Sequence, residues 1–158
     1  MAERALSPKT PTASARELMS FRLGTQMFCV DAIAVKEVRN WSQATLLPRS
    51  PSYLRGVINL RGIILPIVDI GVLMGLAPND ATDDRVIIVV WVQKRLVGLL
   101  VDEVCDLVTA PQEAVETTSD LTGEAIHTIV RELITVEGAV LGIISLEQVM
   151  PRREGSSA

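Results

Sequence analysis

The sequence contains few residues of the types that usually bind nucleic acids. Aromatic residues make up 3% of the chain, and lysine and arginine are scattered without long runs. With so few aromatic side chains there is little surface on which bases could stack. The net charge of -4 and the isoelectric point of about 5.0 give no basic face of the kind that nucleic acids or anionic membranes attract. The composition therefore argues against nucleic-acid binding.

Segments apolar enough to cross a membrane are also missing. The longest candidate, residues 62–78, contains Asp69, two prolines and several glycines, and it falls short of the roughly 20 apolar residues that a helical span needs. Residues 1–17 contain charges and prolines in place of the apolar stretch of a signal peptide. We therefore expect a cytoplasmic protein without direct membrane insertion.

The short motifs that indicate cofactors or catalytic groups do not occur. There is no glycine-rich nucleotide-binding motif and no Cys-x-x-Cys pair. The single histidine, His127, has no serine or cysteine nucleophile motif near it. The acidic segment 79–84 lacks the spacing of a calcium loop and is typical of a solvated loop. We expect no cofactor, no metal and no enzymatic activity.

The neighbouring carboxylates and the two cysteines offer little chemistry either. Asp102 and Glu103 are adjacent, and in an extended chain they would point to opposite faces, which is unsuitable for paired acid-base catalysis. Cys29 and Cys105 both lie in apolar surroundings. We expect both thiols to be buried and reduced, with a disulfide as the alternative.

Branched aliphatic residues dominate the chain and favour β-strands. Hydrophobic residues make up 48% of the sequence, mostly without aromatics. Three hairpins are predicted, over residues 18–30, 86–101 and 132–144, with Gly24 and Gly138 at two of the turns.

The two ends of the chain differ in composition from the segment between them. Residues 1–15 are rich in proline, serine, threonine and alanine and are expected to form a disordered tail, and residues 151–158 a second one. One domain is expected between them, over residues 16–150.

The segment 53–70, YLRGVINLRGIILPIVDI, is too long for one strand. Its only internal turn signal is residues 59–62, which predicts a fourth hairpin of residues 56–60 against 63–68. Arg61 would then lie at or beside the tip and be displayed to solvent. An exposed arginine contributes little to folding but can contribute much at an interface, so Arg61 is either a partner contact or an ordinary surface residue.

Helices are predicted to be few and short. Asp31 is a plausible N-cap for a helix over residues 31–40, and Asp69 could cap a short turn after it. Ser145 and Gln148 have the spacing of a capping box. Four hairpins and three small helices indicate an all-β architecture of barrels with a few short helices.

The ordered set of segments resembles the CheW family of chemotaxis coupling proteins. The matching segments are, in order, AVKEVRN, LRGVINLRGIILPIVDI, RVIIVVWVQKRLVGLLVDEV and LITVEGAVLGIISLEQV, within about residues 19–150. The resemblance implies two five-stranded SH3-like β-barrels packed on a shared hydrophobic core. It also implies an adaptor that links transmembrane chemoreceptors to the histidine kinase CheA, in arrays beneath the inner membrane.

The resemblance further nominates residues that bind partners. Receptor binding in the family uses the apolar groove between the barrels and the arginine of the N-L-R-G turn, here Arg61. Val35, Glu37 and Gly56 match other family motifs, and Val86 matches only as an apolar residue. The implied partners are the CheW-like regulatory domain of CheA and the cytoplasmic tips of chemoreceptors, with CheW–CheW ring contacts as a further option.

Three other functions stay open from the sequence. A nucleic-acid-binding barrel would need a basic stripe and clustered aromatics, whereas Trp41, Tyr53 and Trp91 are dispersed. An enzyme would need a site that no motif reveals. An adaptor repurposed outside chemotaxis would share every feature described above. Salt-dependent binding to DNA or RNA would favour the first function, and turnover by the isolated protein would favour the second.

Overall fold

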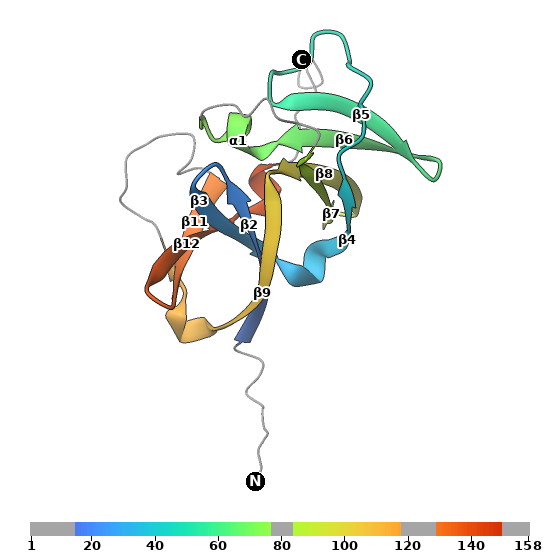
Figure 1. Ribbon diagram of the computed structural model, residues 1–158. Helices are drawn as coiled ribbons and strands as arrows, with labels where there is room; N and C mark the ends of the chain where they lie inside the picture. The colour runs from blue at the N-terminus through green and yellow to red at the C-terminus, as the bar shows by residue number, and fades with distance from the viewer. Residues whose placement is uncertain (1–14, 77–83, 118–128, 150–158) are drawn as a thin grey trace, which may run out of the picture.

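Two β-sheets make up the protein (Figure 1). The computed structural model describes residues 15–76, 84–117 and 129–149. The six-stranded sheet has the order β10-β11-β12-β3-β2-β9, and the five-stranded sheet has the order β4-β7-β8-β6-β5. The strands of the first are β2 (Ala15–Leu23), β3 (Gln26–Asp31), β9 (Glu103–Pro111), β10 (Glu116–Thr117), β11 (Val130–Val136) and β12 (Ala139–Ile144). The strands of the second are β4 (Val35–Asn40), β5 (Leu54–Leu60), β6 (Ile63–Asp69), β7 (Val86–Val92) and β8 (Arg95–Val101).

All four predicted hairpins are confirmed. They are β2–β3, β5–β6, β7–β8 and β11–β12, each an antiparallel pair. Three of them turn through two residues that both have positive φ, as at Arg61 (53°) and Gly62 (89°). Two positive φ values give the chain the twist that a two-residue hairpin turn requires.

The packing of the core explains why the sequence of β7 is a nearly unbroken run of apolar residues. The buried side chains of the described residues form three clusters, one within each sheet and one shared between the sheets. Ile87 and Val89 belong to the cluster within the five-stranded sheet, whereas Ile88 and Val90 belong to the shared cluster. Because both faces of the strand are covered, every position along it favours an apolar residue.

The shared cluster holds the two sheets together. It combines Phe21, Phe28 and Val30 of the six-stranded sheet with residues such as Val68 and Leu99 of the five-stranded sheet. The predicted shared hydrophobic core is therefore present. The described chain crosses between the sheets in two places, from β3 to β4 and from β8 to β9.

The predicted all-β class with short helices is confirmed, but two closed five-stranded barrels are not what the hydrogen bonding shows. One sheet has six strands, and among the described strands no pairing joins the two edges of either sheet. The five-stranded sheet is nevertheless strongly curled. Thr45, in the segment after β4, pairs with Val57 of β5 through two backbone hydrogen bonds of 2.8 and 2.9 Å.

The predicted helix over residues 31–40 is wrong. A 3₁₀ turn, η2 (Ala32–Ala34), is followed directly by β4, and Asp31 makes no side-chain cap. The free edge of β7 offers backbone donors and acceptors that β4 satisfies, with Val35 opposite Val90 and Asn40 opposite Val86. This tertiary pairing outweighs the weak helical pattern.

The other helical predictions have mixed outcomes. Asp69 does cap the helix α1 (Ile70–Leu73), because its side chain accepts a hydrogen bond from the Val72 amide. Ser145 precedes only the 3₁₀ turn η5 (Leu146–Gln148) and makes no side-chain cap, so the predicted capping box is wrong. A further 3₁₀ turn, η4 (Gln112–Ala114), links β9 to β10. Within the described ranges, no helix has both the length and the apolar character to cross a bilayer.

Candidate functional site

Arg61 lies at the tip of the β5–β6 hairpin, as the sequence predicts. The side-chain oxygen of Asn59 accepts a hydrogen bond of 2.8 Å from the Gly62 amide and so fixes the turn locally. The Arg61 side chain is 63% exposed. The hairpin therefore presents a guanidinium to solvent at its end.

Glu37 of β4 binds this guanidinium, although β4 and β5 are the two edge strands of the five-stranded sheet. Arg61 Nη2 donates to Glu37 Oε1 at 2.6 Å, and Arg39 Nη1 lies 3.4 Å from Glu37 Oε2. The hydrogen bond from Arg61 is the largest cause of a lowered pKa for Glu37, partly offset by desolvation. The curl of the five-stranded sheet thus brings the predicted site residues Arg61 and Glu37 into contact. Arg39 also contacts Glu37, and the family motifs did not point to it.

Val35 belongs to the same region, but Val86 does not. Val35 and Glu37 are two residues apart on β4, but a β-bulge lies between them, so that Val35 pairs with Val90 and Glu37 with Val89. Val86 lies opposite Asn40, at the other end of the β4–β7 ladder from Val35. Both valines are partly buried against the shared cluster. Val35 is thus near the ion pair, whereas Val86 contributes packing at a distance.

Gly56 is buried and offers no side chain to a partner. Its φ is 134°, and a Cβ atom there would lie 2.5 Å from the backbone oxygen of Thr45. Such a separation is too short for any real contact, so a side chain at position 56 would push the segment after β4 off strand β5. Gly56 therefore acts on the site indirectly, by letting this segment close over β5.

Exposed apolar side chains occur beside the hairpin tip and at other places on the described surface. Val38 on β4 is 42% exposed, and Ile63 and Ile64 beside the hairpin tip are 48% and 61% exposed. Ile33, in the crossing from β3 to β4, is 93% exposed, and Leu107 on β9 is 65% exposed. The position of Val38 between Glu37 and Arg39 was visible in the sequence, but the wrong helix over residues 31–40 concealed the strand pattern.

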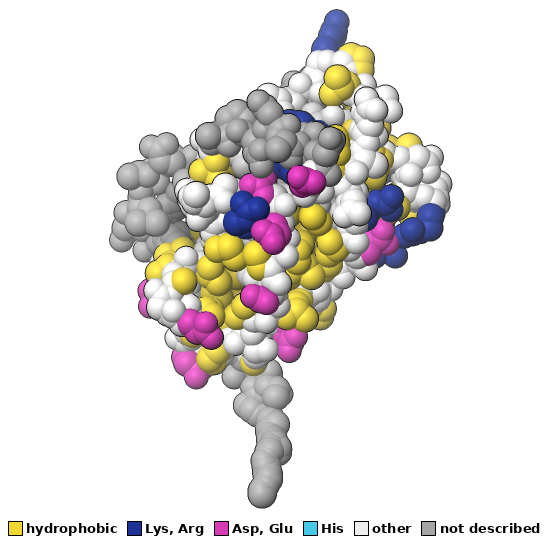
Figure 2. Space-filling view, viewed as in Figure 1, with side chains coloured by type: hydrophobic (Ala, Val, Ile, Leu, Met, Phe, Trp, Pro, Cys, Tyr) yellow, Lys and Arg dark blue, Asp and Glu magenta, His cyan; other side chains and the backbone are white. Residues whose placement is uncertain are grey.

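The face that carries β9, β2 and β4 shows an apolar area (Figure 2). Hydrophobic side chains gather in the middle of this view, over β2 and β9 and toward β4, with acidic side chains around them. Met19, Val35 and Val104, from these three strands, are partly buried against the shared cluster. We call these three residues the seam surface, because they lie where the two sheets meet.

Residues 15–76, 84–117 and 129–149 contain no group of three or more His, Cys, Asp and Glu side chains placed to hold a metal ion. His127 and residues 79–83 of the acidic segment lie outside these ranges.

The two thiols are both free, but only one is buried as predicted. Burial raises the pKa of Cys29 to about 12. Cys105 is exposed, contrary to expectation, because β9 lies at the edge of its sheet. Partial desolvation nevertheless raises the pKa of the Cys105 thiol, and the negative charges of Glu103 and Asp106 raise it further.

A two-sheet β domain with a charged hairpin tip and an apolar seam is typical of the class of protein-interaction modules. Comparison with known proteins identifies the family within this class. The family model described as the CheW-like domain matches residues 17–154. The chain therefore belongs to the CheW family.

The similarity extends over most of each relative. The chain is 41% identical to the chemotaxis protein CheW of Rhizobium meliloti, covering 93% of this chain and 95% of the relative. It is 40% identical to the probable chemotaxis protein CheW of Rhizobium etli, covering 90% and 92%. Among solved structures it resembles the scaffolding protein TtCheW from Thermoanaerobacter tengcongensis, with a TM-score of 0.79, 25% identity and coverage of 85% and 91%.

Proposed function

We propose that this protein is a non-enzymatic chemotaxis adaptor that couples chemoreceptors to the histidine kinase CheA and so lets receptors control the kinase. The observation that carries the proposal is that Arg61 and Glu37, which match family motifs far apart in the sequence, meet as one exposed ion pair in a chain of this family. The proposed location is the cytoplasm, at receptor arrays beneath the inner membrane.

The proposed receptor surface combines direct and indirect residues. Val35, Glu37 and Arg61 contact the helical hairpin of a receptor tip, with the seam surface as the apolar part of the site and the charges at its rim. Gly56 acts through the segment that it allows onto β5, and Val86 through packing beneath the surface. The proposed kinase partner is the CheW-like regulatory domain of CheA.

We also propose that each curled sheet corresponds to one SH3-like barrel. Three features support this interpretation: a separate apolar cluster within each sheet, a third cluster shared between the sheets, and the Thr45–Val57 bridge between the segment after β4 and strand β5. In this interpretation residues 16–150 form a single domain of two barrels.

The mechanism that we propose is coupling through binding. An adaptor transmits a signal only if it binds one state of its partners more tightly than another, because equal affinity shifts no equilibrium. The protein therefore needs contacts whose strength differs between the active and inactive arrangements of receptor and kinase. No bond is made or broken by the adaptor itself.

Reconstitution tests the function. A chemoreceptor fragment and CheA are mixed with and without this protein, and phosphorylation of the kinase is measured. We expect kinase activity to respond to the receptor only when the protein is present. A kinase that ignores the protein at near-cellular salt would contradict the proposal, and turnover or salt-dependent nucleic-acid binding by the isolated chain would favour the other classes.

Replacement of Arg61 tests the site. Arg61→Ala should leave the melting temperature nearly unchanged, because exposed substitutions change stability little. It should weaken receptor binding about tenfold or more, as truncation of an interface arginine does. The matched control is Arg95→Ala, since Arg95 is also exposed and also adjoins a hairpin turn. A large loss of stability with normal receptor binding would instead give Arg61 a structural role.

A further inference from the structure

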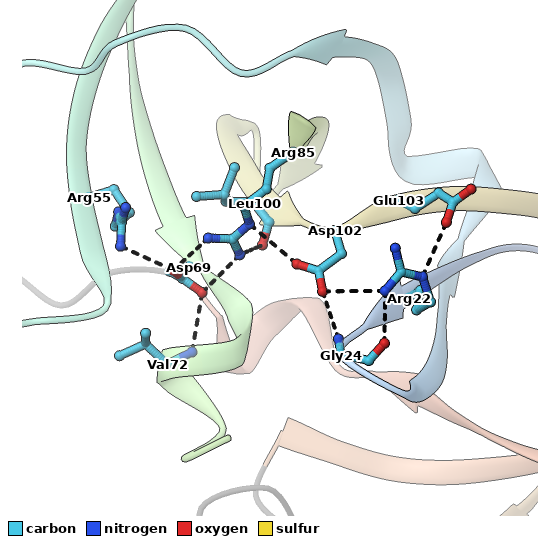
Figure 3. Close-up of polar contacts among 9 residues, drawn as sticks. All are labelled: Arg22, Gly24, Arg55, Asp69, Val72, Arg85, Leu100, Asp102 and Glu103. Carbon is cyan, nitrogen blue, oxygen red and sulfur yellow. Dashed lines mark hydrogen bonds and ion pairs between the residues drawn. The ribbon is translucent and has the colours of Figure 1, made fainter. Parts of the chain in front are cut away.

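A row of charged side chains crosses from one sheet to the other (Figure 3). Arg85, just before β7, lies between the carboxylates of Asp69 and Asp102. The Arg85–Asp69 separation is 3.2 Å and the Arg85–Asp102 separation is 3.3 Å. Arg55 lies 3.4 Å from Asp69 at one end, and Arg22 lies 3.7 Å from Asp102 at the other. The charges alternate in sign along the whole row.

The middle of this row is buried. The side chains of Arg85 and Asp69 are each 3% exposed, and that of Asp102 is 5% exposed. Charged groups removed from water are costly unless they are paired, and well-packed apolar residues in their place often give equal or greater stability. Buried ion pairs contribute most clearly where one arrangement must be specified over others. The stability of the fold alone therefore does not account for this row.

Asp102 holds the position that matters most, because it is the single residue between β8 and β9, where the chain crosses from the five-stranded to the six-stranded sheet. Its Oδ1 faces Arg85 of the five-stranded sheet, and its Oδ2 accepts a hydrogen bond of 2.7 Å from the Gly24 amide in the β2–β3 turn. Its own amide donates to the carbonyl oxygen of Arg22 at 3.0 Å. One side chain thus binds both sheets at the point where they join.

The other crossing has no comparable contact. There η2 links β3 to β4, it contains no buried residue, and Ile33 within it is 93% exposed. Asp31 at its start is bound by Arg16 of the same six-stranded sheet, at 3.0 Å. Of the two crossings in the described chain, therefore, only the one at Asp102 is fixed by a buried ion pair.

We propose that Asp102 is a clasp that fixes the relative orientation of the two sheets. The seam surface depends on it, because Met19 and Val104 belong to one sheet and Val35 to the other. Asp102 is thus a positioning residue for the receptor surface, and this second part of the inference rests on the proposed function. A surface confined to one sheet, such as the Arg61–Glu37 pair, does not depend on the clasp.

Spin-label distances test the clasp without any partner. One label replaces Arg95 on β8 and one replaces Val140 on β12, both exposed, in a Cys105→Ser background with Cys29 buried. Asp102→Asn should broaden the distribution of distances between the two labels or shift its centre. It should also speed amide exchange at Gly24 about tenfold, which corresponds to the loss of one charge-assisted hydrogen bond.

The chain offers a matched control and a second variant. Glu103→Gln removes the same charge at the next position, from a 60% exposed side chain that pairs with Arg22, and should leave the distance unchanged. Arg85→Lys keeps the charge but loses the planar fork that reaches both carboxylates, so it should broaden the distance even if Asp102→Asn does not fold. If either folded variant shows a narrow distance distribution centred at the wild-type value, the proposal that Asp102 is a clasp is wrong.

The functional arm uses the same variants in the receptor–CheA reconstitution. Asp102→Asn should require about tenfold more protein for half-maximal receptor control, because a smaller fraction of molecules holds the binding-competent orientation. Normal control by a variant with a broadened distance would overturn the positioning role. If the wild-type protein itself has no effect on the kinase, the proposed function fails, while the spin-label result still decides the clasp.

Discussion

Arg61 reaches the surface because its backbone is held in a tight turn, although the sequence around it is strongly apolar. The turn needs two residues with positive φ, and the Asn59 side chain closes it by binding the Gly62 amide. Because the side chain starts from the end of the hairpin, it can extend back over the sheet to Glu37. This residue was predictable from local turn chemistry, but its partner was not.

The ion pair makes a prediction about pH. Because Arg61 lowers the pKa of Glu37 in the folded protein, ionised Glu37 favours the folded state. This contribution is complete above the ordinary pKa of 4.5 and is lost as the pH falls through the lowered folded value. Arg61→Ala should therefore move the pKa of Glu37 upward toward its ordinary value, as measured by carboxyl NMR titration.

The same titration contains its own check. Arg95→Ala should leave the pKa of Glu37 unchanged, because Arg95 is not among the groups that shift it. In Arg61→Ala two opposing causes remain, since desolvation raises the pKa of Glu37 and Arg39 lowers it. If Glu37 titrates identically in the wild type and in Arg61→Ala, the ion pair does not persist in solution.

Strand β4 shows why an element can be misread from sequence. Residues 31–40 have apolar side chains at spacings that fit a helix, yet β4 alternates between half-buried and exposed positions. A helix there would leave the edge of β7 without the backbone partners that β4 supplies. Strand β9 was missed for a related reason, since most of its side chains are exposed at a sheet edge and its sequence lacks an apolar run.

At the scale of elements, the loop between β4 and β5 depends on Gly56. Gly56→Ala should lower the free energy of unfolding by about 2–3 kcal/mol, because its methyl group would overlap the Thr45 backbone. It should also weaken receptor binding, since the displaced segment lies beside the site. Chemical denaturation and a receptor-binding assay measure the two effects.

Gly62→Ala is the control for this substitution. Gly62 also has a positive φ, but nothing lies within 4 Å of the Cβ position. The cost should be limited to backbone strain, about 1 kcal/mol. Equal destabilisation by both substitutions would show that close approach of Thr45 is not what requires glycine at position 56.

At the scale of the whole molecule, the shared cluster implies that both sheets unfold together. Val90→Ala, at a fully buried position of the shared cluster, should lower stability by about 2 kcal/mol. The loss should appear equally in both sheets. Tryptophan fluorescence reports the five-stranded sheet, through Trp91 on β7, and NMR signals of β12 amides report the six-stranded sheet.

The two probes should give one common midpoint in the wild type and one lowered midpoint in Val90→Ala. Val140→Ala on β12 is the control, since its side chain is 62% exposed and its loss should change little. Two separate midpoints would mean that the sheets are independent units and that the shared cluster contributes little to their association.

The sequence by itself determined the hairpins, the tip position of Arg61 and the cap at Asp69, because each depends on residues close together in the chain. Tertiary structure decided that residues 35–40 form a strand, that Glu37 binds Arg61, and that Asp102 joins the two sheets through Arg85 and Gly24. These outcomes depend on which unpaired edge or buried charge a distant segment must satisfy, and local sequence does not contain that information.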